Sequence, residues 1–378
     1  MNNGRLGQPG NDKVTMLNRK DMYAVILAGG SGERFWPMST SRRPKQFLTI
    51  PSGKPLIRAA VERIKGLIPQ NHIFIITRRD LVGLTRRAIP GFPAGNIIGE
   101  PCGRDTAAAV ALGAAIVKKR NPEAAFCVLT ADQVIGNRAE FIKTLREAFR
   151  LAFSGDCLVT IGIKPDYPST GFGYIEAGAA LGRRSGTSAF KVRRFVEKPD
   201  QKTAMKYFSK RSFYWNSGMF IWGVSSIEKA IAAHRPPLMR LIGSVANAAG
   251  SGAFQRALKK EYAKLEKISI DYAILEKARN IVMVGGSFDW DDVGSWSALE
   301  KHCRKDSHGN IMLGQAAALD AGGNIAVAED GMIAMVGVRD LVVVRSGAAT
   351  LVCARDRVQD VKKIVALLKN SGKYKGLV

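Results

Sequence analysis

The stretch Leu27-Ala28-Gly29-Gly30-Ser31-Gly32-Glu33-Arg34-Phe35-Trp36-Pro37 decides the fold class of this chain, because its glycines directly follow an apolar run of strand length, Met22–Ala28. Three glycines after a strand let the backbone approach a phosphate closely and turn its N–H groups toward it. Arg34, and Lys45 a short way downstream, supply cations for a dense anion. The stretch therefore predicts a phosphate-binding loop at the end of the first strand.

Spacing separates this loop from two other phosphate-binding motifs. A dinucleotide fingerprint built on Gly30 and Gly32 would place a third glycine where Phe35 stands, and a P-loop requires G-x-x-x-x-G-K-[ST], which the sequence lacks. An ordinary glycine-rich turn is the alternative, since glycine spacing alone is a weak signal. The added Arg34-x-x-Pro37 and Pro44-Lys45 pairs favour the phosphate loop over such a turn.

Outward from the loop, short apolar runs rich in β-branched residues alternate with helical patterns, as in βαβ units. Runs that are apolar throughout are typical of a sheet covered by helices on both faces. We therefore expect an α/β fold with a doubly wound, mostly parallel sheet and with ligands at the carboxyl ends of its strands. The expected strands are Met22–Ala28, Ile73–Thr77, Asn96–Gly99, Phe126–Thr130 and Cys157–Ile161, and the expected helices are Leu56–Leu67, Asp105–Lys119 and Ala139–Phe153.

The chain changes character twice beyond this region. Between residues 164 and 222, loops rich in glycine and aromatic residues predict an insertion that closes one side of a cleft, with strands at Lys191–Val196 and Met219–Trp222. After Trp296, glycines separate short apolar runs, which predicts a small β module. These runs include Met332–Val336, Leu341–Val344 and Thr350–Cys353.

The end of the sequence has the pattern of an amphipathic helix. Its apolar positions are Val358, Val361, Val365 and Leu368, with Asp356 as the expected N-cap. We therefore divide the chain into a loose polar tail over residues 1–20, a large domain over residues 21–303 and a β domain with a terminal helix over residues 304–378.

Composition and charge limit the cellular location and the binding partners that we expect. The 378 residues contain five scattered cysteines and carry a net charge of +25. No apolar run approaches the ~20 residues of a membrane helix, and the polar start lacks the apolar segment of a signal peptide, so we expect a cytoplasmic protein with no membrane partner. The charge suits nucleotides, sugar phosphates or nucleic acid. Because the basic residues are dispersed and no nucleic-acid-binding motif is present, we expect no specific nucleic-acid binding.

Two aspartates are candidate metal ligands. Asp132 ends an apolar strand, and Asp292 lies in a turn between Trp290 and Gly294. In-line attack on phosphorus requires neutralisation of charge on the phosphate oxygens, and one or two carboxylates with the substrate phosphates can hold Mg²⁺ for this purpose. An aspartate after a strand is also often only a turn or cap residue.

Taken together, the motifs resemble those of the nucleotide-sugar pyrophosphorylases, and within that family the mannose-1-phosphate guanylyltransferases. The resemblance runs from Tyr23 to about Leu368. Besides the first loop and Pro44-Lys45-Gln46, it includes Gly103-Arg104-Asp105-Thr106-Ala107, Ala131-Asp132, Gly171-Phe172-Gly173-Tyr174-Ile175, Phe195-Val196-Glu197-Lys198-Pro199, Trp215-Asn216-Ser217-Gly218 and Trp290-Asp291-Asp292-Val293-Gly294-Ser295-Trp296.

The resemblance implies a Rossmann-like catalytic domain followed by a small left-handed β-helix domain, and Mg²⁺ held by Asp132 and Asp292. It implies catalytic roles for Arg34 and Lys45. The implied nucleotide-binding residues are Leu27, Ala28, Gly29, Gly30, Ser31, Gly32, Gly103, Arg104, Asp105 and Thr106, and those for the sugar phosphate are Gly173, Glu197, Lys198 and Asn216.

The implied reaction transfers GMP from GTP to mannose 1-phosphate, in an enzyme expected to be a homodimer through Ser269-Ile270-Asp271-Tyr272 and the β module. Two departures from the family pattern bear on it. Asp105 replaces a common Asn and favours guanine, while Gln133 replaces a common His beside Asp132 and leaves that polar contact open. Glucose 1-phosphate with UTP or dTTP, or a non-catalytic protein that binds nucleotide sugars, are the alternatives.

Overall fold

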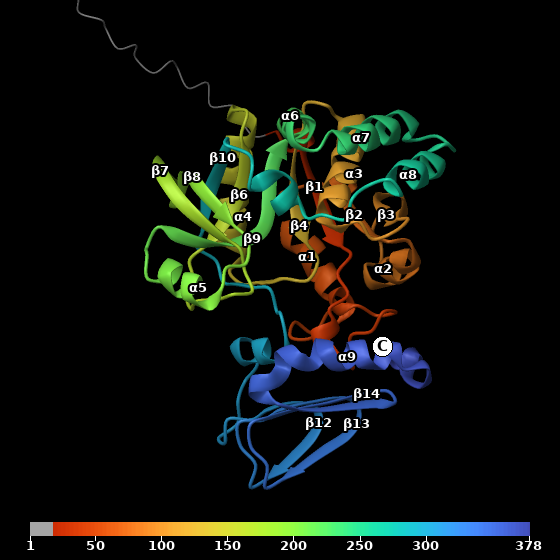
Figure 1. The fold of residues 1–378 in the computed structure, drawn as a ribbon, viewed down its shortest axis with the longest axis vertical. Helices are drawn as coiled ribbons and strands as arrows, with labels where there is room; N and C mark the ends of the chain where they lie inside the picture. Colours follow the sequence, from red (N-terminus) through yellow and green to blue (C-terminus); the bar gives the residue numbers. More distant parts are fainter. Residues whose placement is uncertain (1–17) are drawn as a thin grey trace, which may run out of the picture.

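The computed structural model describes residues 18–378, so most of the predicted N-terminal tail lies outside the described residues. A nine-stranded sheet in the order β3-β2-β1-β4-β9-β6-β10-β8-β7 forms the centre of the large domain (Figure 1). Its strands are β1 (Met22–Ala28), β2 (Ile73–Arg78), β3 (Ile97–Glu100), β4 (Ala125–Thr130), β6 (Leu158–Ile163), β7 (Tyr174–Arg184), β8 (Thr187–Val196), β9 (Phe213–Gly223) and β10 (Ile281–Gly286).

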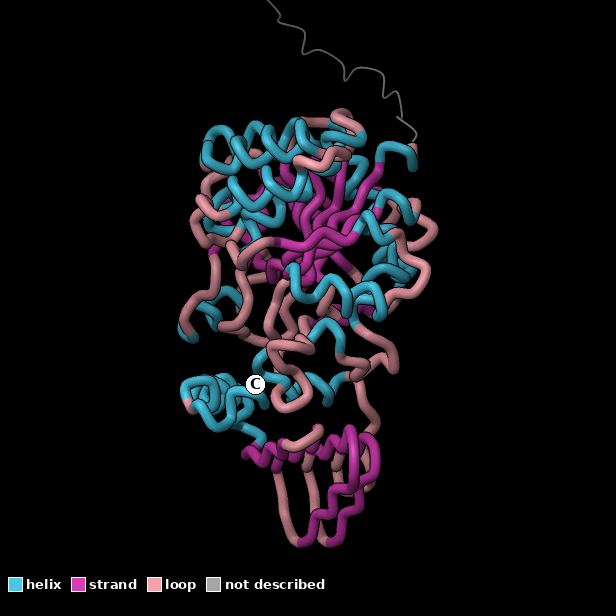
Figure 2. Tube along the Cα trace, turned by 90° about the vertical axis from the view of Figure 1, so that its right-hand side faces the viewer, coloured by secondary structure: helices cyan, strands magenta, loops and turns pink. Residues whose placement is uncertain are grey.

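Helices cover both faces of this sheet (Figure 2). They are α1 (Leu56–Ile64), α2 (Val82–Ala88), α3 (Asp105–Arg120), α4 (Arg138–Ser154), α5 (Gln201–Phe208), α6 (Val224–His234), α7 (Pro236–Ala248) and α8 (Phe254–Tyr262). Alternate residues of β1 enter different cores: Ala24 and Ile26 pack with α1 and α4, whereas Tyr23 and Val25 pack with α3. The predicted α/β fold is confirmed, and the strands and helices expected before residue 164 are present with small shifts at their ends.

The region between residues 164 and 222 was predicted to be an insertion, but its last strand, β9, is part of the main sheet. β9 lies in the middle of the sheet, antiparallel to β4 on one side and to β6 on the other. The described strands β1, β2, β3 and β4 pair in parallel, as do β6 and β10. The sequence did not reveal this, because a central strand is apolar on both faces whichever way it runs.

A smaller domain follows, with the strands β12 (Ile311–Leu319), β13 (Ile325–Val336), β14 (Leu341–Ser346) and β15 (Ala349–Ala354) and the helix α9 (Val361–Asn370). β12, β13 and β14 pair in parallel and β15 returns antiparallel. Asp356 is not the N-cap of α9, because a 3-10 turn over Arg355–Asp360 intervenes and brings Asp360 to that position. α9 lies between the small sheet and the large domain (Figure 1).

The two domains share one hydrophobic cluster, here called the joint core. From the large domain it contains Phe35, Trp36, Met38 and Leu48, which follow the predicted phosphate-binding loop (residues 29–34, here called the phosphate loop), and Val293, Trp296 and Leu299, which follow Asp292. From the small domain it contains Ile311, Ile325, Val327, Val342, Val344, Ala349, Leu351, Val358, Val361, Val365 and Val378. The segments around two predicted site residues are therefore packed against the small domain. Among residues 18–378, no helix has the length and apolarity needed to cross a bilayer.

Candidate active site

The phosphate loop leaves β1 at the carboxyl edge of the parallel strands, as predicted. Its start is fixed by the carbonyl of Ala28, which accepts from Gln46 Nε2 at 2.8 Å and from Thr77 Oγ1 at 2.9 Å. Gly32 has φ +62°, and a Cβ at this position would overlap the Cβ of Lys45. Only glycine fits both the left-handed backbone and this close approach. Gly29, Gly30 and Ser31 are exposed, so their backbone is open to a ligand.

The predicted cations and carboxylates lie together beyond this loop. Lys45, only 7% exposed, donates from Nζ to Asp132 Oδ2 at 3.0 Å and also to the backbone carbonyl of Asp292. Arg34 is close enough to lower the pKa of Asp292 through its charge. Its Nε is buried and has no hydrogen-bond partner among the described residues. A buried guanidinium N–H without an acceptor suits a phosphate oxygen.

The electrostatics of this cluster favour a cation. Burial raises the pKa of Asp292 to about 6, and the negative charges of Asp291 and Asp132 add to this, while Lys45 and Arg34 oppose it. Within residues 18–378 no group of three or more potential metal-ligating side chains is found. Two crowded carboxylates are nevertheless the donor set with which Mg²⁺ is bound when substrate phosphates and water complete its shell. The residues present therefore fit this ion.

The turn that carries Asp292 has a strained backbone. It follows β11 (Trp290–Asp291), which pairs with β5 (Val134–Ile135) just beyond Asp132. Val293 has φ +47°, a conformation that is an outlier for a β-branched residue and costs of order 1–3 kcal/mol. Burial of Val293 in the joint core and a bond of 2.6 Å from its N–H to Asp291 Oδ1 hold this conformation. Packing of the turn thus fixes the direction of Asp292.

The residues predicted to bind the sugar phosphate form a second cluster. Gly173 O accepts from the Asn216 N–H at 2.8 Å, and Glu197 Oε2 lies only 2.3 Å from the position that a Cβ of residue 173 would take. The Glu197 side chain is 7% exposed, and its Oε2 has no hydrogen-bond partner among the described residues. Lys198 pairs with the other oxygen of Glu197 and keeps its own side chain 58% exposed. The cluster offers a buried acceptor and an accessible cation.

Gln133 links the two clusters and settles the contact that the sequence left open. Its Nε2 donates to the carbonyl of Ser217, next to Asn216, at 2.6 Å. The backbone carbonyl of Gln133 accepts from Arg63 Nη2 at 2.9 Å. The backbone after Asp132 is therefore tied directly to the strand that carries Asn216.

The segment from Gly103 to Thr106 leads into α3. Asp105 is the first helical residue, as the sequence predicted, and the N-cap position belongs to Arg104 without a side-chain bond. The Arg104 guanidinium donates to the carbonyls of Tyr262 and Ala263, at 3.3 and 2.6 Å. Asp105 is exposed and accepts from the Thr106 N–H at 2.7 Å. The Arg104 side chain is thus hydrogen-bonded to the end of α8. Gly103 is exposed.

Glu100 was missed in the sequence reasoning. It ends β3, and burial raises its pKa even though the Tyr262 hydroxyl donates to Oε1. Its Oε2 lies 3.4 Å from the position of a Cβ on Gly29, beside the phosphate loop. The available signal was a single acidic residue directly after the predicted strand Asn96–Gly99.

Asp271 was noticed only as part of a predicted dimer surface. It begins a π-helical turn, Asp271–Leu275, and accepts from Asn216 Nδ2 at 3.0 Å. No pattern in the sequence connects residues 216 and 271, because the contact arises only when the sheet is assembled.

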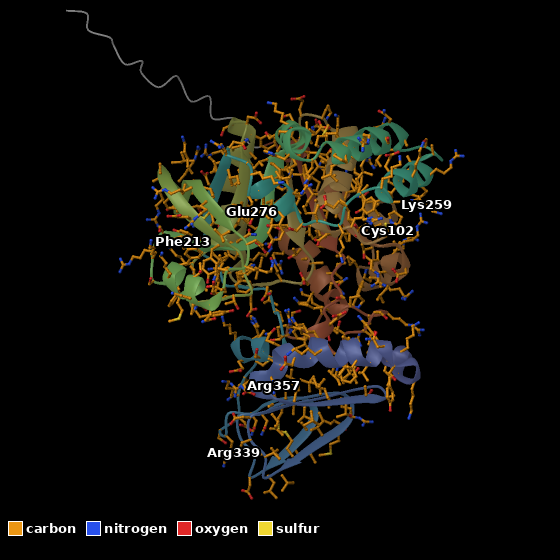
Figure 3. The ribbon with its side chains drawn as sticks, in the orientation of Figure 1. Cys102, Phe213, Lys259, Glu276, Arg339 and Arg357 are labelled. Atoms are coloured by element: carbon orange, nitrogen blue, oxygen red, sulfur yellow. The ribbon has the colours of Figure 1, made fainter. Side chains whose placement is uncertain are left out.

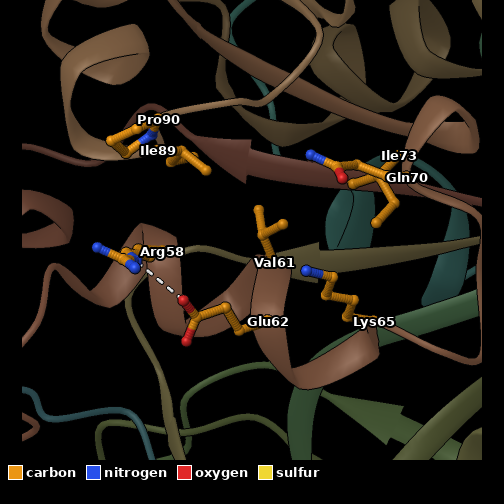
Figure 4. A pocket seen from close by; sticks show the side chains of 8 residues that line it. All are labelled: Arg58, Val61, Glu62, Lys65, Gln70, Ile73, Ile89 and Pro90. Atoms are coloured by element: carbon orange, nitrogen blue, oxygen red, sulfur yellow. Dashed lines mark hydrogen bonds and ion pairs between the residues drawn. The ribbon is translucent and has the colours of Figure 1, made fainter.

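The structure also has a small pocket of about 140 Å³ (Figure 4). It is lined by Arg58, Val61, Glu62, Lys65, Gln70, Ile73, Ile89 and Pro90. Ile73 is the first residue of β2, so the pocket is at the amino edge of the parallel strands. The site residues follow the carboxyl ends, and the pocket is therefore not part of the site.

Comparisons with known proteins agree with this geometry. The nucleotidyl transferase family model matches residues 23–308, and the MannoseP isomerase/GMP-like beta-helix domain matches residues 314–368. Mannose-1-phosphate guanylyltransferases from Klebsiella pneumoniae and Escherichia coli K12 are 38% and 35% identical to the chain, covering 93% and 95% of it and 74% and 76% of their own lengths.

A crystal structure from Thermus thermophilus, described as a mannose-1-phosphate geranyltransferase, has a TM-score of 0.83 and 35% identity, and the match covers 92% of this chain and 99% of that one. These matches confirm the resemblance seen in the motifs and the order of the two domains. The chain belongs to the nucleotidyl transferase family and, within it, to the mannose-1-phosphate guanylyltransferases.

Proposed function

We propose that the protein transfers GMP from GTP to mannose 1-phosphate, giving GDP-mannose and pyrophosphate. A phosphate oxygen of the sugar phosphate attacks the α-phosphorus of GTP, and the bond from that phosphorus to pyrophosphate breaks, so that pyrophosphate leaves with the electron pair. The observation that carries the proposal is the position of Lys45, which joins Asp132 to the Asp292 turn beside the phosphate loop. The substrates named for the relatives support the choice of nucleotide and sugar.

The chain's own residues bind and orient the reactants. The sugar phosphate is itself an ionised nucleophile, so positioning and charge neutralisation can carry the rate. Arg34, with its unpartnered Nε, and Lys45 face the triphosphate and stabilise the departing pyrophosphate. Mg²⁺ held by Asp132 and Asp292 would neutralise charge on the phosphate oxygens when bound.

The second cluster orients the hexose. Lys198 faces the phosphate of mannose 1-phosphate, because its ammonium is the accessible cation there. Burial works to lower the pKa of Lys198, but the bond and charge of Glu197 and the charge of Asp271 keep it above the ordinary value. Glu197 Oε2, buried and without a partner among the described residues, accepts from a sugar hydroxyl.

The direct test is pyrophosphate release with Mg²⁺ for GTP, UTP, dTTP, ATP and CTP, each paired with mannose 1-phosphate and glucose 1-phosphate. We expect selective turnover of GTP with mannose 1-phosphate. Preference for another pair would keep the chemistry and overturn the substrates. A folded protein that releases no pyrophosphate from any pair would be the non-catalytic relative.

Replacing Lys45 with methionine is expected to lower kcat by about 10²-fold, in the range seen when one electrostatic group of a transition-state site is removed. Methionine keeps the length and apolar volume of a side chain that is 7% exposed. The measurement is steady-state pyrophosphate release, with Lys54→Met as the control, because Lys54 pairs with Glu62 away from the site. Equal turnover in both variants would remove Lys45 from the catalytic group.

Glu100 is proposed as the residue that recognises guanine. Guanine presents the N1–H and the exocyclic amine as adjacent donors, and a carboxylate can accept from both. In Glu100→Gln, the Tyr262 hydroxyl would continue to donate to the side-chain oxygen. The NH₂ group would then face the base, where it cannot accept from the two guanine donors. We expect kcat/KM for GTP to fall about tenfold relative to UTP.

The matched variant is Asp105→Asn, which tests the carboxylate predicted from the sequence to contact guanine. Because Asp105 is exposed and already accepts from Thr106 N–H, the ratio of GTP to UTP turnover should remain close to that of the wild type. A shift in Asp105→Asn with none in Glu100→Gln would return base recognition to Asp105.

A further inference from the structure

The segment Ile268–Glu276 contacts both halves of the candidate site. At its start, the Ile270 N–H donates to Thr106 Oγ1 at 2.9 Å, on the nucleotide side. At its end Glu276, labelled in Figure 3, accepts from the Glu197 N–H at 3.3 Å, on the sugar side. Between them lies the π-helical turn that begins at Asp271. Such turns are rare and are found frequently at functional sites.

Asp271 determines which way the Asn216 amide points. Asn216 Nδ2 donates to Asp271 Oδ1 at 3.0 Å. Asn216 Oδ1 accepts from the Gly218 N–H at 3.2 Å and from Thr160 Oγ1 at 3.5 Å. The amide oxygen is therefore occupied, and one N–H of Nδ2 is left for a ligand. This orientation makes Asn216 a hydrogen-bond donor toward a ligand.

Asp271 also acts on the two charged residues of the sugar cluster. Burial and the charge of Glu197 raise the pKa of Asp271 to about 6, opposed by Lys198 and by the bond from Asn216. Lys198 itself has φ +45°, a backbone conformation that is uncommon for lysine. Asp271 thus bonds to the donor Asn216 and is close enough to interact through its charge with the acceptor Glu197 and the cation Lys198, which the hexose phosphate would meet.

We propose that Asp271 is a positioning residue of the hexose 1-phosphate site, which orients Asn216 so that its free N–H meets a sugar hydroxyl while Glu197 accepts from another. This inference rests on the proposed function, because it assigns the second cluster to the hexose. Asp271 acts through Asn216 and is not a group that touches the reacting atoms. A purely structural Asp271 would affect folding and both substrates alike.

The test is calorimetric binding of mannose 1-phosphate and, separately, of GTP, with Mg²⁺ present. In Asp271→Ala, Asn216 is free to rotate, and we expect affinity for mannose 1-phosphate to fall about tenfold, as for loss of one oriented hydrogen bond, with GTP affinity unchanged. Asp271→Asn retains an acceptor for Asn216 Nδ2 and is expected to recover most of the affinity. Asp156→Ala, at an exposed aspartate paired with Lys229, is the matched control and should match the wild type.

A double-mutant cycle separates positioning from a general effect. In an Asn216→Ala background, Asp271→Ala should cause no further loss, because the residue through which it acts is gone. Equal weakening of both substrates, full additivity with Asn216→Ala, or a loss in Asp271→Asn as large as in Asp271→Ala would each overturn the role. Wild-type binding without pyrophosphate release would overturn the proposed function alone, and failure of the wild type to bind any hexose 1-phosphate would overturn both.

Discussion

An Asp292→Asn variant is expected to lose Mg²⁺-dependent pyrophosphate release by about 10³-fold or more while remaining folded. The carboxylate is held in the strained turn that the joint core fixes, near Asp132 and Lys45. An amide has the same shape but lacks the charge that binds a hard cation. Burial already disfavours the charged carboxylate, so the neutral amide is not expected to cost stability.

The measurement is turnover as a function of Mg²⁺ concentration, with thermal unfolding of the same preparation. Asp289→Asn is the control, because Asp289 is an exposed aspartate three positions earlier in the same segment. If Asp292→Asn keeps wild-type turnover and the same Mg²⁺ dependence, Asp292 is not a metal ligand. If it loses turnover only together with its fold, the carboxylate has a structural role.

A Trp296→Ala variant is expected to lose about 3–5 kcal/mol of stability, the usual cost of removing a large buried aromatic side chain. Trp296 is fully buried, packs against Phe35 with ring centroids 4.9 Å apart, and donates from Nε1 to the carbonyl of Trp36 at 3.2 Å. It therefore connects the segment after Asp292 to the segment after the phosphate loop. We also expect turnover to fall at temperatures where the variant is still folded.

Trp222→Ala is the matched comparison for this prediction. Trp222 is equally buried but packs in the large domain against Phe126 and Phe220, away from the joint core. Urea unfolding should show comparable destabilisation of the two variants, whereas only Trp296→Ala should lose turnover in the folded state. Equal loss of turnover would mean that the joint core has no special connection to the site.

Much of the fold could be predicted because its signals are local. The apolar runs of β1, β2 and β4, the alanine-rich composition of α3 and the periodicity of α4 depend on neighbouring residues only, and the structure has all five elements. The position of β9 could not be predicted, because strand order is decided by contacts between residues far apart in the sequence. The N-cap at Asp356 was wrong for a local reason, since the helical spacing of the valines continues through the 3-10 turn that precedes α9.

The residues of the candidate site likewise fall into those that local motifs predicted and those that only long-range contacts reveal. Arg34, Lys45, Asp132 and Asp292 were named because each lies in a motif, and the structure brings them together. Glu100 and Asp271 became visible only through their partners, Tyr262 and Asn216. The homodimer, the cytoplasmic location and the limits of the two domains stay predictions.

The bond from Trp36 Nε1 to the Leu377 carbonyl, 2.8 Å long, joins residues 341 positions apart. Lys369 of α9 likewise pairs with Glu33 inside the phosphate loop. The large sheet can close with shorter connections, but the predicted phosphate-binding loop reaches its final support only when residues 369–377 pack against it. Because contacts of such long range form late in folding, catalytic competence is expected to be the last property that the chain acquires during refolding, after the sheet itself has formed.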